Sequence, residues 1–120
     1  MDDEHPARLI WAYAAKVDLS DLEAAVKSRE GGAGMPQTSL HLLLALWLYA
    51  MTRGVGSARE LARLCQSEAA FRWLCGGVSV NHRMLSEFRA REGERVGRLL
   101  TQHVAGLSLA GLISLDEIAQ

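Results

Sequence analysis

Nine arginines lie between residues 53 and 98 of this 120-residue chain, and no lysine accompanies them. The same segment holds five glutamates, so its net charge is +4, whereas residues 1–52 carry −3 and residues 99–120 carry −2. A planar guanidinium suits two-pronged contacts with phosphate groups and with the edge of guanine. The composition therefore favours a nucleic-acid partner, although a GC-rich genome, which would also enrich Ala and Gly, explains the arginines equally well.

The segment FRWLCGGVSVNHRMLSEF, residues 71–88, joins two apolar helical runs through a double glycine. In the second run, which begins near Asn81, the apolar residues on one side are Met84, Leu85 and Phe88. At about 100° per residue the opposite side carries small and basic residues. These are Arg83, Ser86 and Ala90, flanked by His82 and Arg89. A helix, a Gly-containing turn and a second exposed helix make up the helix-turn-helix arrangement, whose second helix lies in the DNA major groove.

Two classes of DNA contact are predicted from this pattern. Base edges would be read by Arg83, Ser86 and Arg89, while the start of the helix near Ser79 to His82, which includes Asn81, would direct backbone N–H groups at a phosphate. The arginines predicted to contact phosphates are Arg53, Arg59, Arg63 and Arg72. If about five phosphates are neutralised, the logarithm of the affinity falls with the logarithm of the salt concentration at a slope of about −4 to −5. Without DNA, the same residues would form a solvated helix face.

The acidic, thiol and imidazole groups form no familiar catalytic or metal site. Two-metal phosphoryl transfer needs carboxylates that converge on a pair of ions, whereas Glu87, Glu92 and Glu94 are interpreted as a solvated helix face. The groups that could bind zinc are Cys65, Cys75, His82 and His103, and their spacing matches no common structural zinc pattern. We therefore interpret the cysteines as buried thiols, and expect no metal, no cofactor and no enzyme activity in this chain alone.

The elements that position these residues are predicted to be helices. The chain is 49% hydrophobic with two prolines, and it is richer in Leu, Ala and Arg than in β-branched or aromatic residues, which favours an all-α, compact multi-helix bundle. Predicted helices run from Pro6 to about Lys16, from Ser20 to a flexible connection at 29–37, from about Ser39 to Arg53, from Ser57, and from Ser67 to Gly76. The helix over 39–53 is apolar nearly all round, which places it at the centre of the bundle.

Several polar and aromatic residues have a predicted structural role. Ser20 with Glu23, and Ser57 with Glu60, match the S-x-x-E capping box. Ser67 is expected to cap a short helix, and His5 with Pro6 is interpreted as a helix start. The tryptophans are interpreted as core residues rather than base-stacking groups, because apolar neighbours flank each at helical spacing. They are Trp11, Trp47 and Trp73.

The second half of the chain ends in a long helix and a different kind of tail. The helix beginning near Asn81 is predicted to reach about Ala110, with a kink or break near Gly93. The tail LISLDEIAQ, residues 112–120, has a strand-like pattern that the rest of the chain does not complete. The predicted organisation is thus a helical domain over 1–111 followed by a short separate segment.

Composition also bears on where the protein works. Two cysteines are too few for a disulfide framework, which favours a reducing cytoplasm. The apolar run from Leu40 to Met51 is too short to cross a bilayer, and the acidic N-terminus lacks the basic region of a signal peptide. We expect a soluble cytoplasmic protein with no membrane partner.

Taken together, these motifs resemble the N-terminal domain of bacterial insertion-sequence transposases of the DDE class, whose catalytic domain is ribonuclease-H-like. The resemblance rests on HPARLIWA, LLLALWLYAMTRGVGSARELARLC, FRWLCGGVSVNHRMLSEFR and GLISL, in this order. FRWLxGG followed by HRxxxxFR is the most specific part. The sequence departs from the family at residues 34–37, which read GMPQ where members tend to show Gly-Arg-Pro-Pro, so an arginine that could contact phosphate is missing from this loop.

The resemblance implies that residues 1–111 recognise double-stranded DNA at the terminal repeats of the element, in the bacterial cytoplasm and at the nucleoid. Residues 112–120 would then begin a truncated catalytic domain or a linker, before the first catalytic aspartate. The divalent metal of the family would be held by three acidic residues of that missing domain.

A second function stays open. The domain could be an oligomerisation or regulatory module of a transposase that pairs subunits as a homo-oligomer, without sequence-specific DNA contact. The residues that would let a second helix approach closely are Ser86, Ala90, Gly93 and Gly97. A third possibility is the product of a remnant gene that folds and does nothing further.

Overall fold

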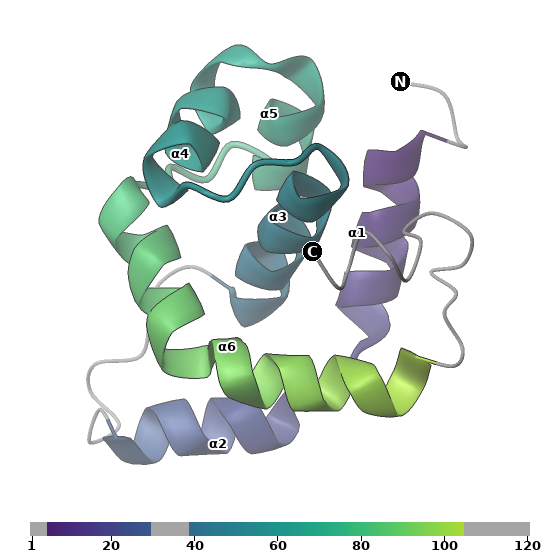
Figure 1. The fold of residues 1–120 in the computed structure, drawn as a ribbon, viewed down its shortest axis with the longest axis vertical. Helices are drawn as coiled ribbons and strands as arrows, with labels where there is room; N and C mark the ends of the chain where they lie inside the picture. The colour runs from purple at the N-terminus through teal and green to yellow at the C-terminus, as the bar shows by residue number, and fades with distance from the viewer. Residues whose placement is uncertain (1–4, 30–38, 105–120) are drawn as a thin grey trace.

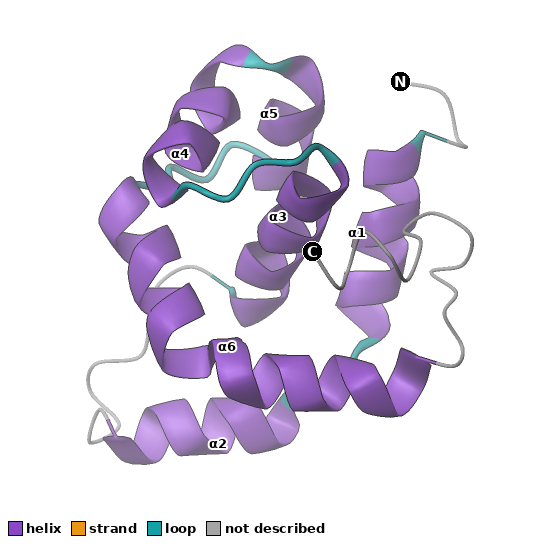
Figure 2. Ribbon diagram, viewed as in Figure 1, coloured by secondary structure: helices purple, strands orange, loops and turns teal. Residues whose placement is uncertain are grey.

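The computed structural model describes residues 5–29 and 39–104, which form six helices (Figure 1). They are α1 (Pro6–Lys16), α2 (Ser20–Arg29), α3 (Leu40–Thr52), α4 (Ala58–Ser67), α5 (Ala69–Cys75) and α6 (His82–Val104). Figure 2 shows helices and loops but no strand in these two ranges, so the predicted all-α class is confirmed. None of the helices described is long and apolar enough to cross a membrane.

Helix α3 is the centre of the core, as its apolar sequence predicted. Every residue from Leu42 to Ala50 is buried, so no side of this helix is left for solvent. Helix α1 packs along α3, and α5 contacts both of them. The largest fully buried side chains come from five helices and the segment between α1 and α2; they are Ile10, Leu19, Leu43, Leu44, Leu46, Leu61, Phe71 and Leu85.

Two predicted helix starts are confirmed by their hydrogen bonds. The Nδ1 atom of His5 accepts a hydrogen bond from the backbone N–H of Ala7 at 3.0 Å, and Pro6 follows as the first residue of α1. The hydroxyl of Ser57 accepts from the backbone N–H of Glu60 at 3.2 Å at the start of α4. Each side chain satisfies an N–H group that the helix itself leaves unpaired.

Two other predicted caps are wrong. Ser20 does not cap α2 but lies inside its first turn, because Asp18 accepts hydrogen bonds from the Ser20 backbone N–H at 3.0 Å and from its hydroxyl at 2.6 Å. Ser67 does not cap α5 but ends α4, where its hydroxyl donates to the carbonyl of Arg63 at 3.1 Å. A single residue, Glu68, separates α4 from α5, so Ser67 belongs to the last turn of α4 and lies one residue too early to cap α5.

The double glycine forms a tight turn after α5. The backbone N–H of Val78 donates to the carbonyl of Cys75 at 2.9 Å, and the two residues between have φ angles of 56° at Gly76 and 87° at Gly77. Positive φ at both central positions is the requirement of a type I′ turn, which glycine meets at little cost. The chain then reaches Asn81, whose side-chain oxygen accepts from the backbone N–H of Met84 at 2.8 Å and caps α6.

Helix α6 turns one stripe toward the core and changes direction along its length. The buried residues of this stripe are Leu85, Phe88, Glu92 and Val96. The ribbon bends near mid-helix in Figure 1, in agreement with the kink predicted near Gly93. Glu92 is only 3% exposed, so the prediction that it belongs to a solvated face is wrong. Its spacing from Phe88 and Val96 places it on the buried stripe instead.

Three predictions concern residues outside the described ranges. They are the connection around residues 30–37, the end of the last helix near Ala110, and the strand-like segment 112–120 with the domain boundary before it.

We predict that Gly76→Ala lowers the free energy of unfolding by about 1–2 kcal/mol, the cost of a left-handed backbone for a residue with a side chain. A Cβ at this position would meet no atom within 4 Å, so the loss would come from the backbone alone. The matched control is Gly56→Ala, where the space is equally open and no positive φ is required. Urea unfolding followed by circular dichroism measures both, and equal stabilities of the two variants would contradict the turn.

Candidate nucleic-acid interface

Helices α4, α5 and α6 carry most of the residues predicted to contact DNA. Helix α4 packs against both α5 and α6, so the two helices joined by the glycine turn rest on a common support. The core side chains of this region include Leu61 of α4, Phe71 of α5 and Leu85 of α6, all fully buried. The three helices therefore hold their outer sides in fixed positions.

The first turns of α6 present the predicted contact residues to solvent. Leu85 and Phe88 are buried, and Met84 is half-buried against the core. The exposed residues are His82, Arg83, Ser86, Arg89 and Ala90. The orientation predicted for this helix from its apolar side is therefore confirmed.

The arginines of this region fall into two groups. Among the described residues nothing forms a hydrogen bond or ion pair with the guanidinium groups of Arg59, Arg72 and Arg83, which are exposed on α4, α5 and α6. These three groups are available to an anionic partner. The others named in the prediction already have partners within the chain.

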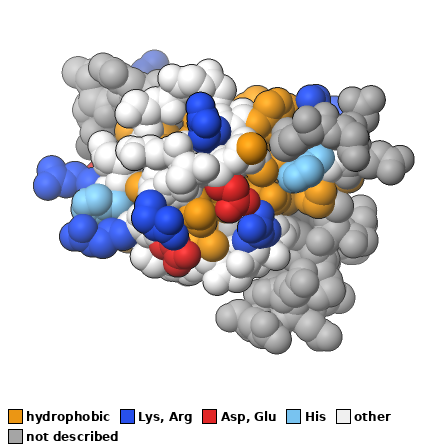
Figure 3. Space-filling view, turned by 90° about the horizontal axis from the view of Figure 1, so that it is seen from above, with side chains coloured by type: hydrophobic (Ala, Val, Ile, Leu, Met, Phe, Trp, Pro, Cys, Tyr) orange, Lys and Arg blue, Asp and Glu red, His pale blue; other side chains and the backbone are white. Residues whose placement is uncertain are grey.

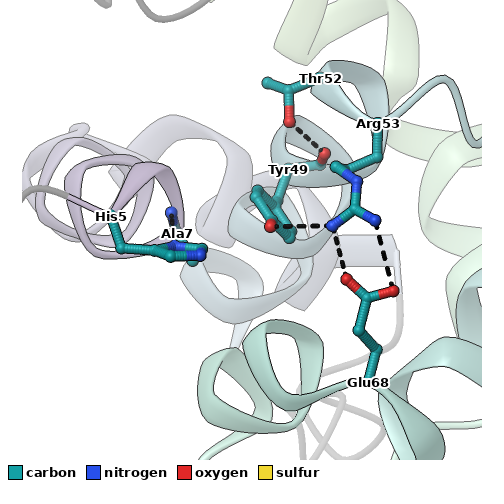
Figure 4. Close-up of polar contacts among 6 residues, drawn as sticks. All are labelled: His5, Ala7, Tyr49, Thr52, Arg53 and Glu68. Carbon is teal, nitrogen blue, oxygen red and sulfur yellow. Dashed lines mark hydrogen bonds and ion pairs between the residues drawn. The ribbon is translucent and has the colours of Figure 1, made fainter. Parts of the chain in front are cut away.

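Arg53 lies at the C-terminal end of α3, where Tyr49 and Glu68 hold its side chain (Figure 4). Its guanidinium donates to the hydroxyl of Tyr49 at 3.2 Å and to both carboxylate oxygens of Glu68, and it lies 5.8 Å from the centre of the Tyr49 ring. The hydrogen bonds to Tyr49 and to Glu68 raise the pKa of Arg53. The ring of Tyr49 in turn lies 4.8 Å from that of Phe71 and 6.2 Å from that of His5. Arg53 therefore links the end of α3 to the corner between α4 and α5.

Arg63 has a looser partner. Its guanidinium lies 3.6 Å from the carboxylate of Glu60, one turn earlier on α4, and both side chains are largely exposed. An exposed pair of this kind contributes between zero and about 1 kcal/mol. Such a pair opens readily, so Arg63 can still turn to another anion.

Arg89 fastens α6 to the core. It donates a hydrogen bond to the carbonyl of Gly56 and lies 4.4 Å from the centre of the Trp47 ring. The indole N–H of Trp47 in turn donates to the carbonyl of Leu85 at 3.1 Å, inside the core. Helix α6 is thus attached to α3 by two adjacent contacts at its second turn.

The surface above α4 and α5 is mixed in charge. Figure 3 looks onto this end of the molecule and shows basic side chains separated by acidic and hydrophobic ones, with a histidine between basic groups at the left edge. Two of the arginines in this region are paired with glutamates, Arg53 with Glu68 and Arg63 with Glu60. A partner would therefore meet separate positive groups on three helices rather than one continuous basic surface.

Trp73 was predicted to be a core residue, and this is wrong. It is 36% exposed, and the guanidinium of Arg8 from α1 lies 5.0 Å from the centre of its ring. Helix α5 has seven residues and buries one side through Phe71 and Leu74, which leaves Trp73 on the other. For Trp47 and for both cysteines the predicted burial is confirmed.

Three of the four groups considered for metal binding, Cys65, Cys75 and His82, lie in the part of the chain whose side chains the structure describes. Within the two described ranges no three His, Cys, Asp or Glu side chains lie together as metal ligands would. His82 is exposed at the start of α6, while the side chain of His103 lies outside the described part.

Sequence reasoning missed two contacts that shape this region. A buried Trp indicates that its indole N–H needs an acceptor, but no pattern in the sequence predicts that the acceptor of Trp47 is the carbonyl of Leu85. The stacking of Arg8 on Trp73 joins residues far apart in the chain, and no local sequence pattern predicts it.

Comparison with known proteins adds one match. The family model described as Transposase domain (DUF772) matches residues 2–91, three quarters of the chain. No curated protein and no solved structure matches.

We predict that Trp47→Phe lowers the free energy of unfolding by about 1–3 kcal/mol, because it removes the hydrogen bond to Leu85 and leaves part of the indole volume empty. The control is Trp73→Phe, at an exposed ring whose indole N–H donates to no other described residue, which should change stability by less than about 0.5 kcal/mol. Guanidinium unfolding measured by circular dichroism compares the two. If Trp73→Phe lowered the free energy of unfolding as much as Trp47→Phe, the hydrogen bond between α3 and α6 would not explain the loss of stability.

Proposed function

The chain belongs to the Transposase domain (DUF772) family, and from this we propose that it binds double-stranded DNA at the ends of an insertion sequence, as the N-terminal domain of a transposase. The observation that carries the proposal is the solvent-exposed side of α6, where Arg83 and Ser86 lie opposite the buried Leu85 and Phe88. Family membership supports a transposase-related role, and the exposed helix suggests how that role is performed.

Helix α6 has the shape and support needed to enter a DNA groove. An α-helix with its side chains is about 10–12 Å wide, close to the width of the major groove. Small residues at Ser86 and Ala90 allow the helix axis to approach the bases, and Arg83 can reach the two acceptors of a guanine. In this arrangement α5, the glycine turn and α6 form a helix-turn-helix unit, with α4 as the helix that supports both.

Phosphate contacts would come from the helices beside α6. Arg59 on α4 and Arg72 on α5 are exposed and have no partner among the described residues. Arg53 and Arg63 would add to them by exchanging a glutamate for a phosphate, since exposed ion pairs are weak. Such contacts fix the position of the duplex, while the contacts of α6 with base edges select the sequence.

In this proposal the chain binds DNA and does not cut it. Strand cleavage and joining need carboxylates that hold metal ions, which the proposal assigns to a separate catalytic domain. The domain described here would hold the element end in a defined register for that chemistry.

A second candidate function is pairing of transposase subunits through the same side of α6. Ser86, Ala90 and Gly97 are exposed along this helix, and small residues let two helices approach closely. A helix that pairs with a second chain in this way would bury Arg83, so the two functions compete for one surface.

We predict that the protein binds a duplex of the element's terminal repeat with an affinity that falls steeply with salt. Three to five neutralised phosphates give a slope of about −3 to −4.5 in a plot of log affinity against log salt. Fluorescence anisotropy over a salt series measures it, with a random duplex of equal length as the reference. A flat response would contradict the proposal.

We further predict that Arg83→Ala weakens binding to the terminal repeat by about 1–3 kcal/mol and reduces the preference over the random duplex. Lys27→Ala is the matched control, because it removes the same charge from an exposed position on α2. Arg89 is a poor choice for this test, since its loss would also release α6 from Trp47. Light scattering on the same samples identifies the competing function: a stable dimer that ignores DNA would favour subunit pairing.

A further inference from the structure

The two cysteines of the chain are neighbours, although ten positions separate them in the sequence. In one continuous helix ten residues would span about 15 Å. The corner at Glu68 instead folds α5 back against α4, which brings the ends of both helices together. Cys65 and Cys75 then line one open hollow of about 440 Å³.

The other residues of this hollow make it a place where a small anion can lie. Arg72 contributes an exposed guanidinium, and the apolar part of the wall includes Trp73 and Val78. Cys65 and Cys75 are 8% and 4% exposed, so the thiols lie at the base of the hollow.

The two thiols also act on each other. A hydrogen bond between them lowers the pKa of the thiol that loses its proton first and raises the pKa of the other, while burial raises the pKa of both. The thiolate is the reactive form of cysteine in exchange with disulfides. One cysteine can therefore react with a disulfide, and the second with the product.

We propose that Cys65 and Cys75 form a dithiol modification site that reacts with a small anionic disulfide, such as glutathione disulfide, held in the hollow beside Arg72. The thiolate of one cysteine attacks one sulfur of the disulfide, and one glutathione thiolate leaves and takes up a proton. The thiol of the other cysteine then loses its proton to solvent and attacks the protein sulfur of the mixed disulfide, which releases the second glutathione as a thiolate that takes up a proton. Two protein thiols are oxidised to one disulfide, and one glutathione disulfide is reduced to two thiols.

The consequence for the protein is a covalent link between the last turns of α4 and α5. These helices support α6 through α4, so the modification acts on the scaffold beneath the exposed side of α6. The proposal does not depend on what that side binds, because its readout is the state of the two sulfurs.

The test uses the full chain, reduced and then exposed to glutathione disulfide in native buffer without oxygen. Intact-mass measurement after alkylation is expected to show a monomer with both thiols lost, no glutathione attached and the mass of two hydrogen atoms missing. Recovery of two alkylated thiols, or of disulfide-linked dimers alone, would overturn the proposal. This arm needs no variant, so a folding defect cannot obscure it.

Variants separate the two steps. Cys65→Ser and Cys75→Ser should each stop at the mixed disulfide with one glutathione attached, because the thiol that would release it is missing. Circular dichroism checks that each variant is folded. If a serine variant does not fold, the alanine variant at the same position, Cys65→Ala or Cys75→Ala, is used instead. Loss of the remaining thiol in either monomeric variant with no glutathione attached would overturn the two-step exchange.

A matched pair of reagents tests the part played by Arg72. Arg72→Ala should slow the reaction with glutathione disulfide, which carries carboxylates, and leave the reaction with the cationic disulfide cystamine unchanged or faster. A variant that reacts with both reagents at wild-type rates would show that the hollow does not select an anion.

Discussion

Burial of α3 on every side is the constraint on which the other helices depend. Its residues from Leu42 to Ala50 are all buried, so α1, α5 and α6 must close around it before the chain is stable. One polar group of this helix, the indole N–H of Trp47, needs an acceptor in the interior. The carbonyl of Leu85 provides it, and this contact places the second turn of α6. The position of the exposed helix is therefore set by the same core that makes the domain fold.

The arginines of this domain serve two purposes that the sequence alone does not separate. Arg53 and Arg89 connect elements of the fold, the first through Glu68 and Tyr49 and the second through Gly56 and Trp47. Arg59, Arg72 and Arg83 make no such contact among the described residues. A count of basic residues overstates the charge available to a partner, because a guanidinium stacked on a ring or paired with a carboxylate is already in use.

Much of the fold could be predicted because it depends on local patterns. The apolar length of α3, the cap at Ser57 and the glycine turn at residues 76–77 each occupy one stretch of sequence. The buried side of α6 followed from helical spacing for the same reason. Two of the errors have a different cause: at Ser67 and Trp73 the outcome depended on where one helix stops and on which neighbour covers it. Pairing of Arg53 with Glu68, and of Cys65 with Cys75, likewise exists only after the corner at residue 68 has formed.

Helix α6 keeps its buried and exposed residues as two separate sets. Leu85, Phe88 and Val96 face the core, whereas the side chains at positions 83, 86 and 90 are exposed. A change at one of these three positions consequently leaves the core packing intact, whereas a change at a buried position disturbs it. As related sequences diverge, we expect the outward positions to drift and the inward ones to stay. The same scaffold could then serve relatives that meet different partners, with no need to evolve a new fold.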